Sequence, residues 1–299
     1  MTTLSADILR WVERSTGPSA RVVAVDELPP SSTEKHRIEL DDGGESTRVL
    51  VLRRYHDTER LATDFAYVPA NEAEALRILG PTDVPAPSLI AVDLAPEICD
   101  VPAILETWVP GRSSFVPFGG VDLERFVRRP AAVLVEIHAV RGGESLPACR
   151  RYAEDGAPAI PPWSPRPRTW ERVLSIVLAE PPSDRPRFIH RDFHGGNVLW
   201  ADAEVSGVVD WATACIGPAG IDLARMRLNL ASDIGAEAAD AFRRAYVEAG
   251  GDDGARHPYW DLVDVCDRLT DLSAPADAGE VAAWARFESW AASVAAELG

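Results

Sequence analysis

Two stretches decide the fold of this chain. The first is His190-Arg191-Asp192-Phe193-His194-Gly195-Gly196-Asn197, and the second is Val205-Ser206-Gly207-Val208-Val209-Asp210-Trp211. Together they follow the pattern H-R-D-x-x-x-x-N with a further Asp about a dozen residues later, which is the spacing used in ATP-dependent phosphoryl transfer. The pattern predicts a kinase.

The chemistry explains why these residue types are needed. Phosphoryl transfer passes through a loose and highly charged transition state, so the protein must orient a hydroxyl group and hold Mg²⁺ against the phosphates. Hard cations such as Mg²⁺ prefer oxygen ligands. Asp192 is therefore the candidate catalytic base, and Asn197 and Asp210 are the candidate metal ligands.

The residues around the motif predict a loop between short strands. Phe188-Ile189 precedes it, Val198-Leu199-Trp200 follows it, and a β-branched run begins at Val205. Gly195-Gly196 would allow a sharp turn that points Asn197 back towards Asp192.

This stretch has two other interpretations. A plain polar turn between core strands would leave the joint spacing of Asp192, Asn197 and Asp210 unexplained. A metallohydrolase could use His190, Asp192 and His194, which would share one face of a strand and offer nitrogen and oxygen ligands. That interpretation leaves Asn197 and Asp210 without a role, and the chain has only six histidines.

On these residues the chain resembles the aminoglycoside phosphotransferase and choline kinase family, small-molecule relatives of the protein kinases. The pair Asp210-Trp211 and the segment from Gly217 to Ala224 also resemble that family, although His190-Arg191-Asp192 stands where H-G-D is common. The resemblance implies an α+β, protein-kinase-like fold with two lobes. Residues 1–108 would form a small antiparallel-sheet lobe that binds nucleotide, and residues 109–299 a larger, mainly helical lobe with the catalytic loop and acceptor site. Asp222, at a helix start, is expected to cap backbone amides.

The same resemblance implies a phosphate-binding cation held by a helix glutamate. The strand from Arg48 to Leu52 ends in Arg53-Arg54, where the family carries Lys or Arg, and Arg53 is the preferred cation. Arg54 remains the alternative, since a one-residue slip would reverse the faces. Glu72 is the expected partner on the following helix, with Glu74 as its alternative.

A hinge that binds adenine is expected at residues 103–111, again from the resemblance. Glu106 and Trp108 would act there mainly through their main chain, with Val51 and Leu199 as apolar groups above and below the base. The phosphate loop departs from the family pattern because residues 28–37 contain no glycine. Hydroxyl groups of Ser31, Ser32 or Thr33 would contact phosphate instead, with Ser32 the preferred residue. GTP in place of ATP therefore remains open.

Composition is consistent with two modules and a reduced compartment. The chain has 299 residues, 46% of them hydrophobic, and four scattered cysteines without a C-x-x-C pair. Neither a leader peptide nor an apolar run long enough to span a bilayer is apparent, so a cytoplasmic protein, monomeric or homodimeric, is expected. A long helix is predicted from Leu123 to Val140, broken or restarted at Pro130. Residues 157–168 are proline-rich and predict a loop, and helices follow from 223 to 298.

The net charge of −17 argues against a nucleic-acid partner and would attract a cationic acceptor. Many carboxylates fall where the family builds its acceptor pocket, although such a run is more often a solvated helix face. They are Asp252, Asp253, Asp261, Asp264, Asp267, Asp271, Asp277 and Glu280. The sequence thus predicts an ATP- and Mg²⁺-dependent O-phosphotransferase for a small hydroxyl compound, such as an aminoglycoside or another cationic antibiotic. Two alternatives remain: a kinase for choline or an amino-sugar, and a nucleotide-binding protein without turnover.

Overall fold

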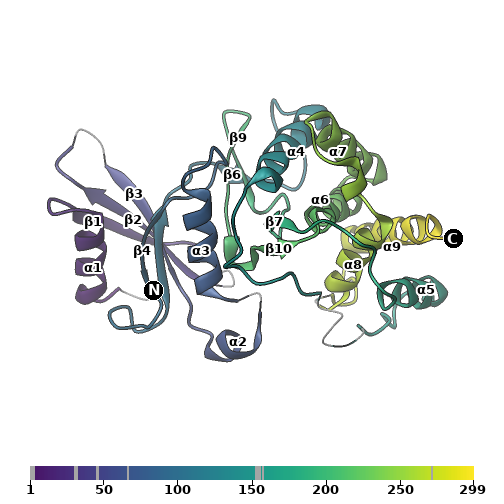
Figure 1. The fold of residues 1–299 in the computed structure, drawn as a ribbon, viewed down its shortest axis with the longest axis horizontal. Coiled ribbons are helices and arrows are strands. Elements are labelled where there is room, and N and C mark those ends of the chain that lie inside the picture. The colour runs from purple at the N-terminus through teal and green to yellow at the C-terminus, as the bar shows by residue number, and fades with distance from the viewer. Residues whose placement is uncertain are drawn as a thin grey trace. The chain divides into compact units, whose positions relative to one another are not determined.

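The computed structural model describes residues 4–29, 33–44, 47–65, 67–151, 156, 158–270 and 272–299. The chain divides into two compact units (Figure 1). The first contains Met1–Pro110 together with Gly207–Thr213, and the second contains Gly111–Ser206 with Ala214–Gly299. The sequence places the segment Gly207–Thr213 in the second lobe, whereas it packs within the first unit.

The first unit is built on an antiparallel sheet of five strands in the order β1-β2-β3-β5-β4. Leu50 and Leu52 of β3 alternate with Val51 and Arg53, so the two leucines face a buried cluster on one side of the sheet. Helix α1 covers that side, because Ile8 and Val12 join the same cluster. The bounds are β1 Arg21–Glu27, β2 Glu34–Asp41, β3 Arg48–Arg54, β4 Leu89–Asp93, β5 Ala103–Thr107 and α1 Ala6–Thr16.

The other side of this sheet carries helix α3, Pro69–Leu79, and the polar residues Lys35, Arg53 and Glu106, and it is called the polar side below. Pro69 begins the helix, where its missing N–H is not required. Tyr55, Ala73 and Ile104 form a small buried cluster on this side. The 3₁₀ helix η2, Trp211–Thr213, packs against α3, and a short helix α2 spans Thr58–Thr63.

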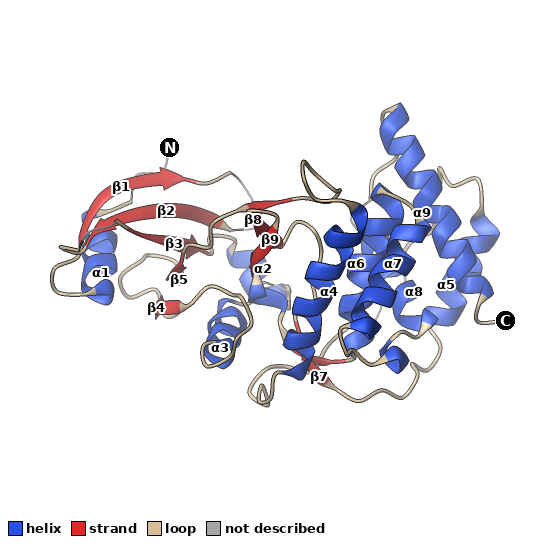
Figure 2. Cartoon of the chain, turned by 90° about the horizontal axis from the view of Figure 1, so that it is seen from above, coloured by secondary structure: helices blue, strands red, loops and turns tan. Residues whose placement is uncertain are grey.

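The second unit is mainly helical (Figure 2). Its helix α6 is buried on nearly all sides, which makes it the central helix against which α7, α8 and α9 pack. Short strands β7 and β10 pair with each other, and β6 pairs with β8. The helices are α4 Leu123–Ala139, α5 Pro167–Val177, α6 Ala219–Asp233, α7 Ala236–Glu248, α8 Pro258–Leu269 and α9 Ala278–Ala296, with 3₁₀ helix η3 at Asp253–Ala255; the strands are β6 Arg112–Ser113, β7 Arg187–Ile189, β8 Val198–Ala201, β9 Glu204–Val208 and β10 Cys215–Gly217.

Two local predictions are wrong in ways that the structure explains. Pro130 lies inside one continuous helix α4 and is itself buried with Phe126 and Leu134 on the apolar face, so packing there outweighs the lost backbone hydrogen bond. The proline-rich loop ends earlier than expected, because Pro167 begins helix α5 as its first residue. All four cysteines are free thiols. No helix in the described ranges is long and apolar enough to cross a membrane.

Candidate functional site

The loop between β7 and β8 brings Asp192 and Asn197 together. The Asn197 side-chain amide donates from Nδ2 to the backbone oxygen of Asp192 over 2.9 Å and to its carboxylate over 3.3 Å. This arrangement fixes the orientation of the amide, with Nδ2 directed at the two acceptor oxygens of Asp192 and Oδ1 on the other side of the amide. The Asp192 side chain remains 28% exposed. A carboxylate and an amide oxygen are thus presented side by side from one loop.

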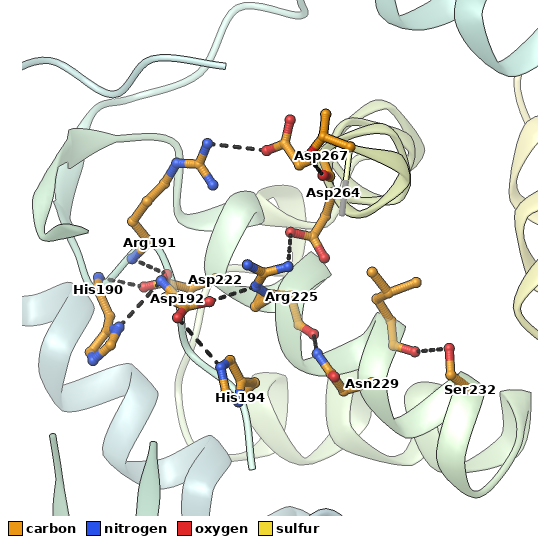
Figure 3. Close-up of polar contacts among 12 residues, drawn as sticks. His190, Arg191, Asp192, His194, Asp222, Arg225, Asn229, Ser232, Asp264 and Asp267 are labelled. Atoms are coloured by element: carbon orange, nitrogen blue, oxygen red, sulfur yellow. Dashed lines mark hydrogen bonds and ion pairs between the residues drawn. The ribbon is translucent and has the colours of Figure 1, made fainter. Parts of the chain in front are cut away.

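Asp222 of α6 holds this loop in place. Its carboxylate accepts the backbone N–H of His190 over 2.9 Å and that of Arg191 over 2.7 Å (Figure 3). It also lies 3.1 Å from Nε2 of His138. Arg191 has a φ of 73°, a left-handed conformation that is unusual for a side chain of this size. The sequence predicts that Asp222 caps its own helix, whereas its oxygen atoms accept from the neighbouring loop.

Gly195 is required by space rather than by backbone freedom. A Cβ atom there would lie 2.4 Å from the backbone oxygen of Ser114, which is too close for any side chain. The Ser114 N–H in turn donates to the Gly195 oxygen over 3.2 Å. The close approach of the Ser114 backbone therefore explains why the predicted turn at Gly195-Gly196 has a glycine at position 195.

Asp192 is surrounded by cationic and aromatic donors. Arg225 of α6 donates from Nε to Oδ1 of Asp192 over 2.8 Å, and His194 Nε2 lies 3.4 Å from Oδ2 (Figure 3). Burial opposes ionisation of Asp192, but His194 and Arg225 outweigh it and hold the pKa of this carboxyl well below its usual range. Asp192 is thus a carboxylate at any physiological pH. Sequence reasoning missed Arg225, because nothing marks it among the other arginines.

The acidic residues of α8 are not a solvated face. Asp261, Asp264 and Asp267 are each at most 4% exposed. Each is matched with an arginine of the same unit: Asp261 with Arg227, Asp264 with Arg225 at 3.4 Å, and Asp267 with Arg191 at 3.1 Å. Asp264 and Asp267 therefore anchor arginines that belong to or contact the catalytic loop, and Asp261 anchors Arg227 inside the helical unit. None of the three faces solvent as a field for a cationic acceptor. Asp252, Asp253, Asp277 and Glu280 are exposed, and Asp271 lies outside the described residues.

A second polar cluster lies in the first unit, around Arg53. Its guanidinium makes ion pairs with Glu72 at 2.8 Å and with Asp210 at 2.6 Å. Glu72 is completely buried and also accepts the hydroxyl of Tyr55 and the backbone N–H of Trp211. Three residues that are distant in sequence, Arg53, Glu72 and Asp210, thus meet on the polar side of the sheet.

The alternatives left open by the sequence have other partners. Arg54 points to the opposite side of β3, where it pairs with Glu34 and Asp100, each at 2.6 Å. Glu74 pairs with Arg77 on the same helix at 3.2 Å. The ion pair that crosses from β3 to α3 is therefore the one between Arg53 and Glu72.

The hinge segment differs in part from expectation. The backbone N–H of Trp108 donates to the oxygen of Val49, so this N–H is engaged within the sheet and is not available to a base. The Trp108 ring lies under the guanidinium of Arg37. Glu106 instead presents its side chain, which is 5% exposed, and burial together with nearby Glu72 raises its pKa to about 8. Leu199 lies on β8 of the second unit, and Ser32 lies outside the described residues.

Sequence reasoning also missed Lys35 of β2. This residue stands directly opposite Arg53 in the β2–β3 register. A signal was present in the sequence, because Lys35 is the only lysine of the chain among 30 basic residues.

The two candidate metal ligands, one in each unit, both offer oxygen atoms. Asn197 Oδ1 and the carboxylate of Asp210, 28% exposed, are oxygen ligands of the kind that Mg²⁺ prefers. By contrast, Nδ1 of His190 and Nδ1 of His194 accept backbone N–H groups of their own loop. No group of three or more His, Cys, Asp or Glu among the described residues is arranged to hold a metal ion. The ligand set proposed for a metallohydrolase is thus engaged in building the loop.

Comparisons with known proteins agree with this geometry. The model of the family described as "Phosphotransferase enzyme family" matches residues 27–261, which is most of the chain. A search of curated protein sequences gives no match.

Three solved structures share the fold over nearly the whole chain. A candidate aminoglycoside phosphotransferase from Ralstonia eutropha JMP134 aligns with a TM-score of 0.66 and 15% identity, covering 99% of both chains. The macrolide 2'-phosphotransferase MphH from Brachybacterium faecium aligns with a TM-score of 0.59 and 18% identity, covering 97% of this chain and 95% of that one. A thermostable mutant of aminoglycoside phosphotransferase APH(4)-Ia, in ternary complex with AMP-PNP and hygromycin B, aligns with a TM-score of 0.60 and 15% identity over 98% of each chain. The α+β, protein-kinase-like fold is therefore confirmed.

Proposed function

Since the chain belongs to the phosphotransferase enzyme family, whose members act on hydroxyl groups of small molecules, we propose that it transfers the γ-phosphoryl group of ATP with the help of Mg²⁺. The observation that carries this proposal is the pairing of Asp192 with Asn197 in one loop, with Asp192 kept ionised. An ionised carboxylate beside an oriented amide oxygen is what a phosphotransferase needs to position its nucleophile and its metal.

Each residue has a proposed role. Asp192 orients the acceptor hydroxyl and takes its proton. Asn197 and Asp210 offer oxygen atoms to Mg²⁺, which when bound would neutralise charge on the phosphates. Arg53, held by Glu72, clamps the phosphates of the nucleotide. Asp210 and Arg53 already form an ion pair with each other. A bound phosphate would replace Asp210 as a partner of Arg53, and a bound metal ion would replace Arg53 as the partner of Asp210.

ATP is favoured as the nucleotide because a relative with the same fold was solved with AMP-PNP. GTP remains an alternative, since residues 28–37 lack glycine and Glu106 places a titratable carboxyl on the polar side of the sheet. Residues 1–108 are proposed to supply the nucleotide site, completed by Asp210, and residues 109–299 the acceptor site.

An antibiotic acceptor is proposed from the relatives, one of which is named a macrolide 2'-phosphotransferase and another of which was solved with hygromycin B. The charge argument for a cationic acceptor is weaker than the sequence suggested, because Asp261, Asp264 and Asp267 are matched by arginines. Choline or an amino-sugar is therefore the second class to test. A cytoplasmic location remains a prediction.

The test is nucleotide consumption across a panel of acceptors. ATP and GTP turnover with Mg²⁺ would be measured with aminoglycosides, macrolides, choline and amino-sugars, for the natural chain and for Asp192→Asn. Loss of a base or nucleophile-orienting carboxylate should lower kcat about 10²–10⁴-fold. Asp202→Asn is the matched control, because Asp202 is exposed in the turn between β8 and β9 and Asn tolerates its left-handed backbone.

The second candidate, nucleotide binding without turnover, predicts a different result. ATP would then bind with the same affinity to the natural chain and to Asp192→Asn, with no acceptor-dependent consumption by either protein. The buried Glu72–Arg53 pair is common to both candidates, so binding alone does not distinguish them.

A further inference from the structure

Lys35 is chemically singular in this chain. All other basic side chains are arginines, yet the one lysine occurs on the polar side of the sheet rather than on an open surface. The two side chains are not interchangeable: arginine presents a planar fork, whereas lysine presents a compact ammonium group with three rotatable donors. The presence of lysine at this one position, in a sequence that otherwise uses arginine, favours a ligand that needs a compact point charge.

The register places Lys35 beside Arg53. Residues directly opposite in an antiparallel pair carry their side chains on the same face, only about 5 Å apart at Cβ. On β2, Ile38 and Leu40 belong to the cluster covered by α1, so Lys35 lies on the other face. That face also carries Glu106 of β5, which acts on Lys35 electrostatically.

Two cations opposite each other are unfavourable unless anions balance them. Arg53 has Glu72 and Asp210 as ion-pair partners. The ammonium group of Lys35, by contrast, has no acidic partner within 4.0 Å among the residues that the structure describes. Burial and the charge of Arg53 lower the pKa of Lys35, although the charges of Asp210, Glu72 and Glu106 act in the opposite direction. An anion in direct contact with the ammonium group would stabilise its charged form.

The segment before Lys35 explains which anion fits. The sequence of residues 28–37 contains no glycine, the residue that allows the closest backbone approach to phosphate. We propose that Lys35 is a second phosphate ligand, which binds the nucleotide polyphosphate beside Arg53 and supplies from a side chain the charge that backbone N–H groups of a glycine-rich loop would provide. This inference rests on the proposed nucleotide site in the first unit.

Because the lysine is unique, it can be tested by chemical labelling of the intact protein. N-Hydroxysuccinimidyl acetate acylates neutral amines, and only the chain's α-amino group and Lys35 carry one. Acetylation of the tryptic peptide 22–37 would be quantified by mass spectrometry, with the α-amino group as internal reference. MgATP is expected to slow acetylation of Lys35 at least fivefold and to leave the reference unchanged, whereas adenosine, which has no phosphate, should not protect.

A set of variants separates ligand binding from a structural role. Lys35→Met keeps the length of the side chain without its charge and should raise the Kd for ATP about tenfold, with Lys35→Arg restoring part of the affinity. Arg48→Gln removes one positive charge from the exposed end of the same β2–β3 hairpin and should leave the Kd unchanged. If Lys35 has only a structural role on this side of the sheet, Lys35→Met would lower the resistance to urea and leave ATP affinity unaltered.

The outcomes distinguish this inference from the proposed function. ATP binding without protection of Lys35, or with an unchanged Kd in Lys35→Met, overturns the role of Lys35 and leaves the phosphotransferase proposal intact. Protection without turnover supports Lys35 and counts against catalysis. A natural chain that binds no nucleotide by calorimetry overturns both.

Discussion

Arg225 donates a hydrogen bond to the carboxylate of Asp192 over 2.8 Å, so the proposed catalytic base is held by a cation from the central helix α6. The same guanidinium lies 3.4 Å from the buried carboxylate of Asp264. Arg225 therefore links the catalytic loop to two helices at once. It lowers the basicity of Asp192 and keeps it ionised, which favours a role in orienting the hydroxyl over a role as a strong base.

Removing this cation should change the pH dependence of catalysis. In Arg225→Gln the pKa of Asp192 rises from well below its usual range towards the value of an ordinary aspartate, about 4. Because activity requires the ionised form, the acidic limb of the kcat/KM profile should move to higher pH. The measurement is kcat/KM between pH 4 and 8, and the loss relative to the natural chain should be greatest at pH 4.

Arg243→Gln serves as the control, since Arg243 pairs with Asp253 at the surface of the same unit. Its profile should overlay that of the natural chain. A uniform loss in Arg225→Gln at all pH values would show instead that Arg225 acts only by positioning the loop.

Glu72 and Glu74 offer a matched pair of helix glutamates. Glu72→Gln removes the charge that holds Arg53, so the KM for ATP should rise about tenfold, since charge-assisted hydrogen bonds contribute about 1.5–3 kcal/mol. Glu74→Gln breaks a pair with Arg77 of the same helix and should change KM by less than about twofold. Equal effects of the two changes would contradict the proposed role of Arg53.

Arg191→Gly should destabilise the protein in a pH-dependent way. Burial raises the pKa of Asp267 to about 6 in spite of Arg191. The stabilising contribution of Asp267 is therefore complete below about pH 4, the pKa of an aspartate in the unfolded chain, and falls as pH rises through 6. Without Arg191 that pKa rises further, and the loss at high pH grows. Glycine also relieves the left-handed backbone, which costs arginine about 1 kcal/mol.

Urea denaturation at pH 5 and pH 8 measures this effect. The variant should be nearly as stable as the natural chain at pH 5 and about 2–3 kcal/mol less stable at pH 8, because breaking a buried ion pair leaves an uncompensated charge. Adding Asp267→Asn to this variant should make its loss of stability nearly the same at pH 5 and pH 8. A loss that is the same at both would mean that the Asp267 carboxylate is not the cause.

Glu106→Gln should make stability less dependent on pH. Burial and the neighbouring Glu72 raise the pKa of Glu106 to about 8, so its stabilising contribution declines as pH rises from about 4.5 through 8. Glutamine keeps the shape of the neutral acid. Its free energy of unfolding, relative to the natural chain, should therefore increase by about 1–2 kcal/mol between pH 6 and pH 9, as measured by urea denaturation.

Much of the fold followed from patterns that local physics enforces. The strand predicted from Arg48, ending in Arg53-Arg54, is β3, and the helix predicted to carry Glu72 is α3. The reaction class followed from the spacing of Asp192, Asn197 and Asp210, and the family and the fold class followed from the family resemblance; all three are confirmed. The roles of the individual residues stay predictions.

What could not be predicted depends on tertiary contacts. Asp222 holds a loop that is 31 residues away in sequence at Arg191, and no local pattern reports that distance. A run of acidic residues at helical spacing predicts a solvated face unless cations from another helix cover it, as Arg225 and Arg227 do here. Pro130 shows the same dependence, because its helix is continuous only when its apolar face is packed.

The return of Gly207–Thr213 to the first unit has a consequence for biosynthesis. During translation the first 110 residues emerge as an incomplete unit, because Trp211 follows only after the whole of residues 111–206. The indole of Trp211 is fully buried, and its backbone N–H donates to Glu72, whose carboxylate lacks this donor until then. Nascent chains should therefore pass through an aggregation-prone period, and a polypeptide that ends at Pro110 should not fold as an autonomous domain.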